Sequence, residues 1–234
     1  MSLIPSSSSE HPLHTGHTIW LIRRQKTQRG NAGNKKKDEE AELVPSVPTN
    51  DAVEDWAKSL KKVATFHSVE GFWQVYGHMT RPSEMTASTD LHMFREGIKP
   101  VWEDPANKRG GKFHVKIRKG VLGSRYWESI LLSVIGEQFG EYSGEICGVV
   151  ISIRHGEDVL SLWTKTCDNQ DMLNKIRDLF KRSLKLPSFV SIEFKRHDAH
   201  HQIDNSSSQP SSSTSSSANG GSGGGGPVWR NARS

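Results

Sequence analysis

Cysteine is scarce in this chain of 234 residues, which contains only Cys147 and Cys167. The two do not form a CxxC pair, and the chain opens without the apolar stretch of a secretory leader. These absences argue against a disulfide scaffold and against a cysteine-type zinc site. A reducing compartment is the simplest location, and we therefore expect a cytoplasmic protein.

Long apolar runs are also absent from the sequence. No uncharged run approaches the roughly 20 apolar residues that a bilayer-spanning helix needs, so we expect a soluble protein without a membrane partner. The length allows one domain with appendages. The formal net charge of +5 favours an anionic partner such as nucleic acid, although many basic proteins bind none.

Composition divides the chain into one domain and several polar segments. Residues 1–10 are serine-rich and are expected to form a disordered tail. The domain is expected to span residues 11–204 and to contain a flexible, Lys- and Gly-rich loop over 25–50. Residues 205–226 are nearly all Ser and Gly, which is typical of a disordered linker, and residues 227–234 follow as a short C-terminal segment.

Apolar periodicity predicts an α+β fold in which three helices pack on one sheet. The first helix opens with Ser68 as its N-cap, the second spans residues 125–137, and the third starts at Asp168. Leu132 lies off the apolar stripe of the second helix. Strands are expected to be antiparallel neighbours, and β-branched or apolar runs predict them at residues 17–22, 91–94, 112–118, 148–154, 159–164 and 189–194.

Seven tryptophans are many for a chain of this length. Trp20, Trp127 and Trp163 lie in strand or helix patterns and are predicted to be core residues. Trp56 and Trp102 lie instead in polar or turn-rich sequence. An aromatic residue in a loop usually covers the edge of a core, but two of them in a basic protein raise the alternative that they stack on an unstacked base.

Charged residues near Trp102 fit a nucleotide ligand. Glu103 follows directly, and a carboxylate accepts two parallel hydrogen bonds from the N1 hydrogen and the amino group of guanine. The alternative is a solvated surface acid. Lys112 and Arg154, each at the end of a predicted strand, are candidates for binding phosphates.

One segment resembles the cap-binding loop of the translation initiation factor 4E family: Gly-Ile-Lys-Pro-Val-Trp-Glu-Asp at 97–104, followed by Asn-Lys-Arg-Gly-Gly-Lys at 107–112. Further similar motifs are His-Pro-Leu at 11–13, Ser-Val-Glu-Gly-Phe-Trp at 68–73, Ile-Gly-Glu-Gln-Phe at 135–139, Ile-Cys-Gly-Val-Val at 146–150 and Leu-Ser-Leu-Trp at 160–163. The resemblance covers about residues 11–201. It implies a curved antiparallel sheet of about eight strands, with three helices on its convex back and a slot for the 7-methylguanosine cap of messenger RNA in its concave face.

The resemblance also implies roles for individual residues. Trp56 and Trp102 would sandwich the 7-methylguanine, whose cationic ring gains a cation–π contribution of about 0.5 to 2 kcal/mol beyond stacking. Glu103 would bind the Watson–Crick edge of the base, and Trp163 would contact the methyl group. Lys112 and Arg154 match positions that bind cap phosphates. A further basic family position is occupied here by Val159, so phosphate affinity is expected to suffer.

A partner surface is implied on the convex side. Family members bind there a Tyr-x-x-x-x-Leu-apolar helix, through positions that match His11, Pro12, Val69, Trp73 and Leu132. The off-stripe position of Leu132 supports this independently, because an outward-facing apolar side chain suits a helix-binding groove. A scattered exposed leucine is the alternative.

The sequence looks closest to the 4E-homologous protein class, which includes plant cap-binding relatives. Principal initiation factors place Leu and then Glu after the tryptophan of the second helix, whereas this chain has Glu128 and Ser129. Losing that acidic contact puts recruitment of the 4G scaffold in doubt. A repressor or specialised initiation factor is therefore expected, and a general initiation factor that recruits the scaffold is the alternative.

Other function classes find less support in the sequence. Metal-dependent hydrolysis needs converging carboxylates, and the acids at 38–42 lie in a low-complexity loop, so no enzyme and no cofactor are expected. His197, His200 and His201 have unconvincing metal-ligand spacing, and no metal site is expected. A cap-independent RNA-binding module that uses the basic face of the third helix is a secondary alternative, and no DNA partner is expected.

Overall fold

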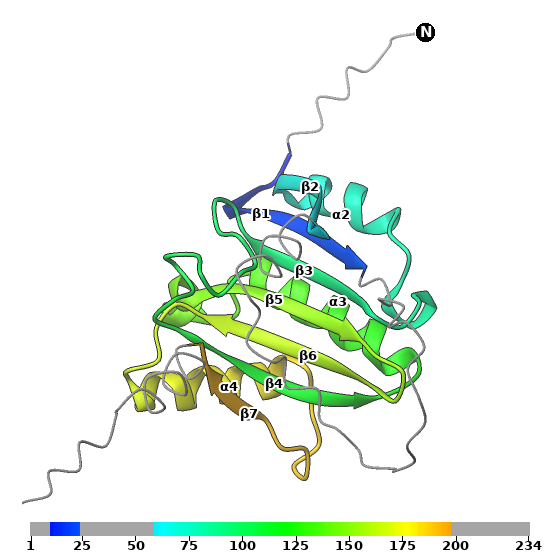
Figure 1. Ribbon diagram of the computed structural model, residues 1–234. Coiled ribbons are helices and arrows are strands. Elements are labelled where there is room, and N and C mark those ends of the chain that lie inside the picture. The colour runs from blue at the N-terminus through cyan, green and yellow to red at the C-terminus, as the bar shows by residue number, and fades with distance from the viewer. Residues whose placement is uncertain (1–9, 24–58, 198–234) are drawn as a thin grey trace, which may run out of the picture.

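Seven strands form one antiparallel sheet in the computed structural model, which describes residues 10–23 and 59–197 (Figure 1). The strand order is β2-β1-β3-β5-β6-β4-β7, and each neighbouring pair is antiparallel. The strands are β1 (Pro12–Arg23), β2 (Lys61–Ser68), β3 (Thr89–Arg95), β4 (Gly111–Arg118), β5 (Ile146–Ile153), β6 (Glu157–Thr164) and β7 (Glu193–Arg196).

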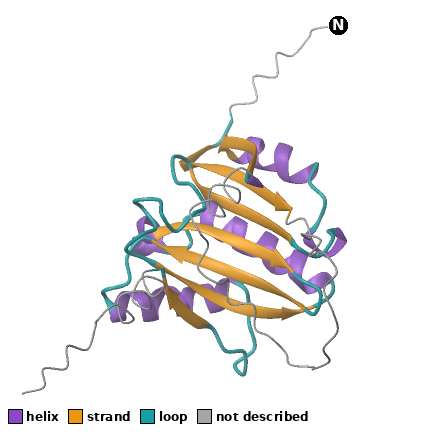
Figure 2. Cartoon of the chain, viewed as in Figure 1, coloured by secondary structure: helices purple, strands orange, loops and turns teal. Residues whose placement is uncertain are grey.

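Three α-helices lie behind this sheet as it is drawn in Figures 1 and 2. They are α2 (Val69–Gly77), α3 (Val121–Ile135) and α4 (Gln170–Ser183), and two short 3-10 helices, η1 (Pro82–Glu84) and η2 (Gly140–Glu145), complete the described elements. Side-chain caps fix two helix starts, because the Ser68 hydroxyl accepts from the Gly71 amide and the Asn169 side chain from the Met172 amide.

The two faces of the sheet differ because side chains alternate along each strand. On the helix side, Phe113, Val115 and Ile117 of β4 are at most 3% exposed and belong to the main core. The opposite face is turned toward the viewer in Figure 1, and we call it the front face. A smaller apolar cluster lies there, formed by Phe94, Cys147, Val150 and Trp163.

The expected fold class is confirmed, with seven described strands where about eight were expected. Helix α3 begins four residues earlier than predicted, because the chain leaves β4 through Gly120, whose φ of 131° only glycine adopts readily. Helix α4 is capped by Asn169 and not by the predicted Asp168. Strand β2 was not predicted, because Lys61 and Lys62 open it in polar sequence.

The strand predicted at residues 189–194 is wrong for most of its length. The described strand β7 starts only at Glu193. Before it the chain turns, since the Val190 amide donates to the carbonyl of Pro187 at 3.1 Å. Phe189, expected to begin the strand, is 86% exposed.

Four expected segments lie outside the described residues: 1–10 apart from Glu10, 25–50, 205–226 and 227–234. In the described part of the chain, no helix is long and apolar enough to cross a membrane. Cys147 and Cys167 are both free and buried.

Burial of Phe180 in α4 generates a stability prediction. This side chain is 0% exposed, so Phe180→Ala should lower the free energy of unfolding by about 3 to 5 kcal/mol. Phe189→Ala is the matched control and should change it by less than about 0.5 kcal/mol, because that ring is exposed. Urea denaturation measures both, and equal losses would contradict the described placement of the two rings.

Candidate cap-binding site

The loop that carries Trp102 is built around the side chain of Asn107. This residue is 0% exposed, and its amide donates to the carbonyls of Lys99 at 2.9 Å and Val101 at 2.7 Å. The backbone just before Trp102 is therefore fixed by a buried side chain from farther along the same loop. Two satisfied carbonyls also remove the desolvation cost that an unpaired polar group would carry.

Asp104, two residues after Trp102, also holds this loop. Its carboxylate accepts from the amides of Lys99 and Ala106, both at 2.9 Å. The side chains of Asn107 and Asp104 thus hold the segment from Lys99 to Asn107 together by hydrogen bonds within the loop. Trp102 and Glu103 lie at its turn, Trp102 half-buried and Glu103 exposed.

The two cysteines attach this loop to the sheet. The thiol of Cys147 donates to the carbonyl of Ala106 at 3.5 Å, and that of Cys167 to the carbonyl of Arg109 at 3.1 Å. Burial, the largest cause, raises the pKa of Cys147 to about 12, so this thiol stays protonated and able to donate. Gly110 allows the close approach, because a Cβ there would lie 1.7 Å from the carbonyl oxygen of Thr164.

An aromatic cluster lies on the front face beside the loop. Trp163 of β6 packs edge-on against Phe94 of β3, with ring centroids 5.4 Å apart and planes at 77°. Trp163 also contacts His197, and the centroids of the two rings lie 4.2 Å apart. Trp102 packs against the same cluster, together with Ile98 and Ala106. The two predicted site tryptophans, Trp102 and Trp163, therefore belong to one apolar surface.

One cation, Lys112, lies beside this cluster, and a second, Arg154, lies farther along the sheet. Lys112 of β4 pairs in register with Trp163, and its ammonium lies 5.9 Å from the centre of that ring. Arg154 follows β5 on the other side of β6, and its guanidinium lies 2.8 Å from the carboxylate of Asp90. Asp90 is only 2% exposed, and the Arg154 guanidinium also donates to the carbonyl of Ile153 at 3.1 Å, so an ion pair and a hydrogen bond both position the arginine head group.

The structure thus places Trp102, Trp163, Lys112 and Arg154 on or beside the front face, with Glu103 next to Trp102. Trp56 lies outside the described residues. Sequence reasoning missed the supporting residues Asn107, Asp104 and Asp90, whose roles depend on contacts that no local pattern encodes. Only the Gly- and Pro-rich surroundings of Asn107 signalled an ordered turn.

The predicted partner residues lie around the start of α2. The amide of Val69 donates to the carbonyl of His11 at 2.9 Å, and Pro12 pairs in register with Ser68. Glu70 accepts from both the backbone amide and the ring of His11, at 2.8 and 2.6 Å. These bonds from His11 lower the pKa of Glu70 to about 2. The first residues of β1 are in this way tied to α2.

Apolar side chains remain exposed on this part of the molecule. Val69 is 37% and Trp73 43% exposed. Trp73 is supported from below, since its ring contacts those of Phe72 and Tyr76 edge-on at 5.0 and 6.0 Å. Leu132 of α3 is half-buried against the main core, so it is less exposed than its off-stripe position predicted.

Glu128 of α3 contacts residues of its own chain. Its carboxylate lies 3.7 Å from the guanidinium of Arg81, which in turn stacks 4.1 Å above the ring of Tyr76. Burial and then the charge of Glu128 raise the pKa of Tyr76 to about 12. The acidic residue that follows Trp127 is therefore engaged by Arg81.

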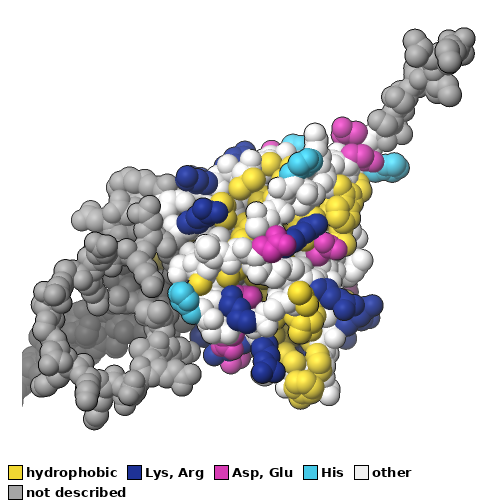
Figure 3. Space-filling view, turned by 90° about the vertical axis from the view of Figure 1, so that its right-hand side faces the viewer, with side chains coloured by type: hydrophobic (Ala, Val, Ile, Leu, Met, Phe, Trp, Pro, Cys, Tyr) yellow, Lys and Arg dark blue, Asp and Glu magenta, His cyan; other side chains and the backbone are white. Residues whose placement is uncertain are grey.

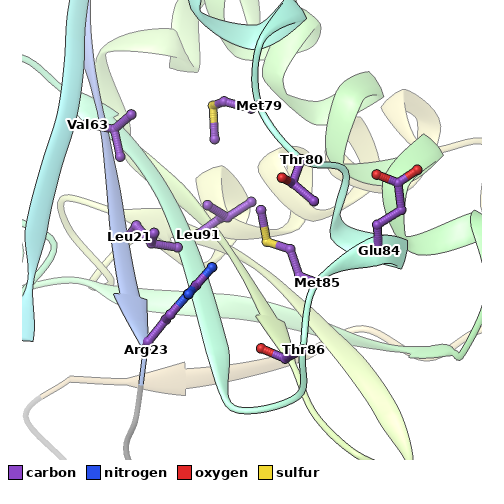
Figure 4. Close-up of a pocket in the computed structure, with 9 residues that line it drawn as sticks. All are labelled: Leu21, Arg23, Val63, Met79, Thr80, Glu84, Met85, Thr86 and Leu91. Carbon is purple, nitrogen blue, oxygen red and sulfur yellow. The ribbon is translucent and has the colours of Figure 1, made fainter.

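A shallow pocket lies near the end of β1, away from the front-face cluster (Figure 4). Its volume is about 260 Å³. Leu21 and Leu91 belong to the helix side of the sheet, so the pocket opens on that side. Figure 3, which shows the right-hand side of the molecule as drawn in Figure 1, has hydrophobic side chains interspersed with charged ones. The lining residues are Leu21, Arg23, Val63, Met79, Thr80, Glu84, Met85, Thr86 and Leu91.

Comparison with known proteins decides the family. A family model described as eukaryotic initiation factor 4E matches residues 12–212. The chain belongs to this family. Oryza sativa translation initiation factor NCBP is 39% identical over 189 residues, which cover 81% of this chain and 72% of the relative. Caenorhabditis elegans translation initiation factor 4E-4 is 46% identical over 145 residues, covering 62% of this chain and 68% of the relative.

A solved structure supports the same assignment. Caenorhabditis elegans eIF4E-3, in complex with the 4E-binding protein Mextli and a cap analog, has a TM-score of 0.67 and 30% identity to this 4E-family chain. The match covers 87% of this chain and 98% of that one. Within residues 10–23 and 59–197, no group of three or more His, Cys, Asp or Glu side chains is arranged to hold a metal ion.

The buried Asn107 amide yields a second prediction. Asn107→Ala leaves the carbonyls of Lys99 and Val101 without their donor, and we expect a loss of about 2 to 4 kcal/mol in the free energy of unfolding. Lys108→Ala, at the exposed neighbouring position, is the control and should have little effect. Urea denaturation followed by tryptophan fluorescence compares the two. Indistinguishable midpoints would show that Asn107 does not hold the loop.

Proposed function

We propose that this chain binds the 7-methylguanosine 5′ cap of messenger RNA and regulates translation initiation. The observation that carries this proposal is the joint placement of Trp102 and Trp163 in one front-face cluster, with the Lys112 ammonium beside Trp163 and the Arg154 guanidinium farther along the sheet at Asp90. Aromatic faces beside positive charge suit a ligand with a planar base and phosphates. The related eIF4E-3 structure, which contains a cap analog, supports the same ligand here.

The methylated base is held by stacking in this proposal. Trp102 stacks on one face of the 7-methylguanine, and Trp56 supplies the second face. The cationic ring gains from both indoles, which distinguishes it from unmethylated guanine. Glu103 accepts hydrogen bonds from the N1 hydrogen and the amino group, and Trp163 contacts the methyl group.

Affinity depends on how far the site is ordered before the ligand arrives. Asn107 and Asp104 fix the backbone that presents Trp102 and Glu103. Asp90 orients the guanidinium of Arg154 in the same way for a phosphate. Three buried or partly buried polar groups therefore reduce the ordering cost of the residues that contact the cap.

The cap proposal is tested by titration with 7-methyl-GTP and with GTP, followed through tryptophan fluorescence. We expect the wild-type chain to prefer the methylated ligand. Trp56→Ala, Trp102→Ala and Glu103→Gln should each weaken 7-methyl-GTP binding about tenfold or more, because each removes a stacking or charge-assisted contact. Trp73→Ala, which removes an exposed tryptophan from α2, is the control and should bind normally.

Two other outcomes have distinct meanings. Equal, weak binding of both ligands would contradict the cap slot. Binding indifferent to methylation and steeply dependent on salt would favour a cap-independent RNA-binding module, in which exposed α4 residues such as Lys175 and Arg182 contact the phosphates.

The partner proposal is that α2 and α3 bind a Tyr-x-x-x-x-Leu-apolar helix through His11, Pro12, Val69, Trp73 and Leu132. Val69 and Trp73, four residues apart on α2, both expose apolar side chains. Neighbouring exposed apolar side chains are typical of a protein–protein interaction site. Ser129 stands where principal initiation factors have an acid, and the neighbouring acid, Glu128, is engaged by Arg81. We infer a cytoplasmic, non-catalytic factor that binds caps without efficient recruitment of the 4G scaffold, and so a repressor or specialised factor.

Trp73→Ala tests the partner surface. A labelled Tyr-x-x-x-x-Leu-apolar peptide should bind the wild-type chain, and the variant should bind at least about tenfold more weakly, since a central tryptophan typically contributes about 2 kcal/mol or more. Fluorescence anisotropy measures this, with Trp102→Ala as the control that should keep its peptide affinity. Unchanged binding by Trp73→Ala would place the partner elsewhere.

The same variants separate the two branches of the family proposal. Added to a cell-free translation extract, the wild-type chain should reduce translation of a capped reporter, whereas Trp102→Ala should not. Stimulation of the capped reporter by the wild-type chain would instead support a general initiation factor.

A further inference from the structure

A second lysine on the front face lies next to the position where the family has a basic residue and this chain has Val159. Lys116 of β4 pairs in register with Val159 of β6. The register between these strands runs without a shift from Gly111 to Arg118. Directly paired residues point to the same face of a sheet, with Cβ atoms about 5 Å apart, so Lys116 and Val159 are immediate neighbours.

Lys116 also shares its face with the proposed phosphate-binding residues. It lies four residues after Lys112 on the same strand, an even separation that keeps both side chains on the front face. At about 3.3 Å per residue, their Cα atoms lie about 13 Å apart. On β6, Trp163 and Val159, which pair with Lys112 and Lys116, are likewise four residues apart and point to the same face.

Arg154 approaches the same place from the other side. Ser152 of β5 pairs with Val159, and with Asp90 of β3. A continuous row therefore crosses the sheet from Asp90 through Ser152 and Val159 to Lys116. The guanidinium of Arg154 contacts Asp90 at one end of this row, and the lysine ammonium lies at the other.

We propose that Lys116 binds the terminal phosphates of the cap and replaces the cation that is missing at Val159. This inference rests on the proposed function, because it assigns a further residue to the same ligand. Arg154 and Lys116 then flank a floor formed by Ser152 and Val159, with Lys112 nearer to the base. The phosphate chain lies across that floor.

The ion pair between Lys116 and Glu157 is compatible with this role. The lysine ammonium lies 3.2 Å from the carboxylate of Glu157, but the two side chains are 60% and 47% exposed. An exposed ion pair contributes little, so a phosphate bearing more than one charge competes with the Glu157 carboxylate for the lysine.

The experiment compares 7-methyl-GMP, 7-methyl-GDP and 7-methyl-GTP on the full chain by tryptophan fluorescence. Lys116→Ala should weaken 7-methyl-GTP binding about 3- to 10-fold, as expected for one partly exposed charge contact, and change 7-methyl-GMP binding less than about twofold. Adding Val159→Lys to Lys116→Ala should restore the triphosphate affinity. Lys175→Ala removes an exposed positive charge from α4 and is the control for net charge.

Each failure has a separate meaning. If the wild-type chain does not prefer methylated ligands, the proposed function is wrong. If it does, but Lys116→Ala matches Lys175→Ala, the assignment of Lys116 is overturned. An equal loss for 7-methyl-GMP and 7-methyl-GTP would also overturn it, because the effect would then not act through the terminal phosphates.

Discussion

The unbroken register between β4 and β6 is the constraint on which the rest of the structure depends. Eight residue pairs, from Gly111 with Thr164 to Arg118 with Glu157, run without a bulge. A slip of one residue would move every side chain of either strand to the opposite face. Because Phe113, Val115 and Ile117 are drawn into the core beneath the helices, their neighbours along the strand must point to the front face. The hydrophobic core thereby fixes the placement of residues that it does not contain.

The two candidate binding surfaces use different structural supports. On the front face, Asn107 and Asp104 order the loop that carries Trp102 and Glu103, and Asp90 pairs with the guanidinium of Arg154. On the helix side, the stacked rings of Phe72 and Tyr76 support Trp73, and the guanidinium of Arg81 lies over the Tyr76 ring. Since the sheet and its core separate these surfaces and they share no side chain, a change at one has no direct route to the contacts of the other.

Much of the fold could be predicted from the sequence because its determinants are local. Apolar periodicity located the three helices, and β-branched runs located five of the strands within a few residues. Prediction failed where tertiary contacts override local preference. Strand β2 has a polar opening but pairs with β1, and the residues before β7 are apolar but form a turn that leaves Phe189 in solvent.

The candidate site divides in the same way. Trp102 and Glu103 became candidates because a tryptophan in turn-rich sequence can stack on a base and an adjacent carboxylate can bind guanine, and the family resemblance then gave them roles. Asn107 and Asp90 were not found, because an amide that spans eight residues and a carboxylate that holds an arginine across strands are properties of the folded chain. Lys116 became notable only through its register with Val159.

The buried thiols have a practical consequence for labelling. The chain contains two cysteines, both enclosed where they hold the Trp102 loop to the sheet. Thiol reagents attack the thiolate, and the high pKa of Cys147 keeps that form rare at neutral pH. A cysteine introduced at an exposed site should therefore accept a dye selectively without removal of either native thiol. Replacing the native pair, as is customary before labelling, would instead remove two contacts between the sheet and the loop that carries Trp102.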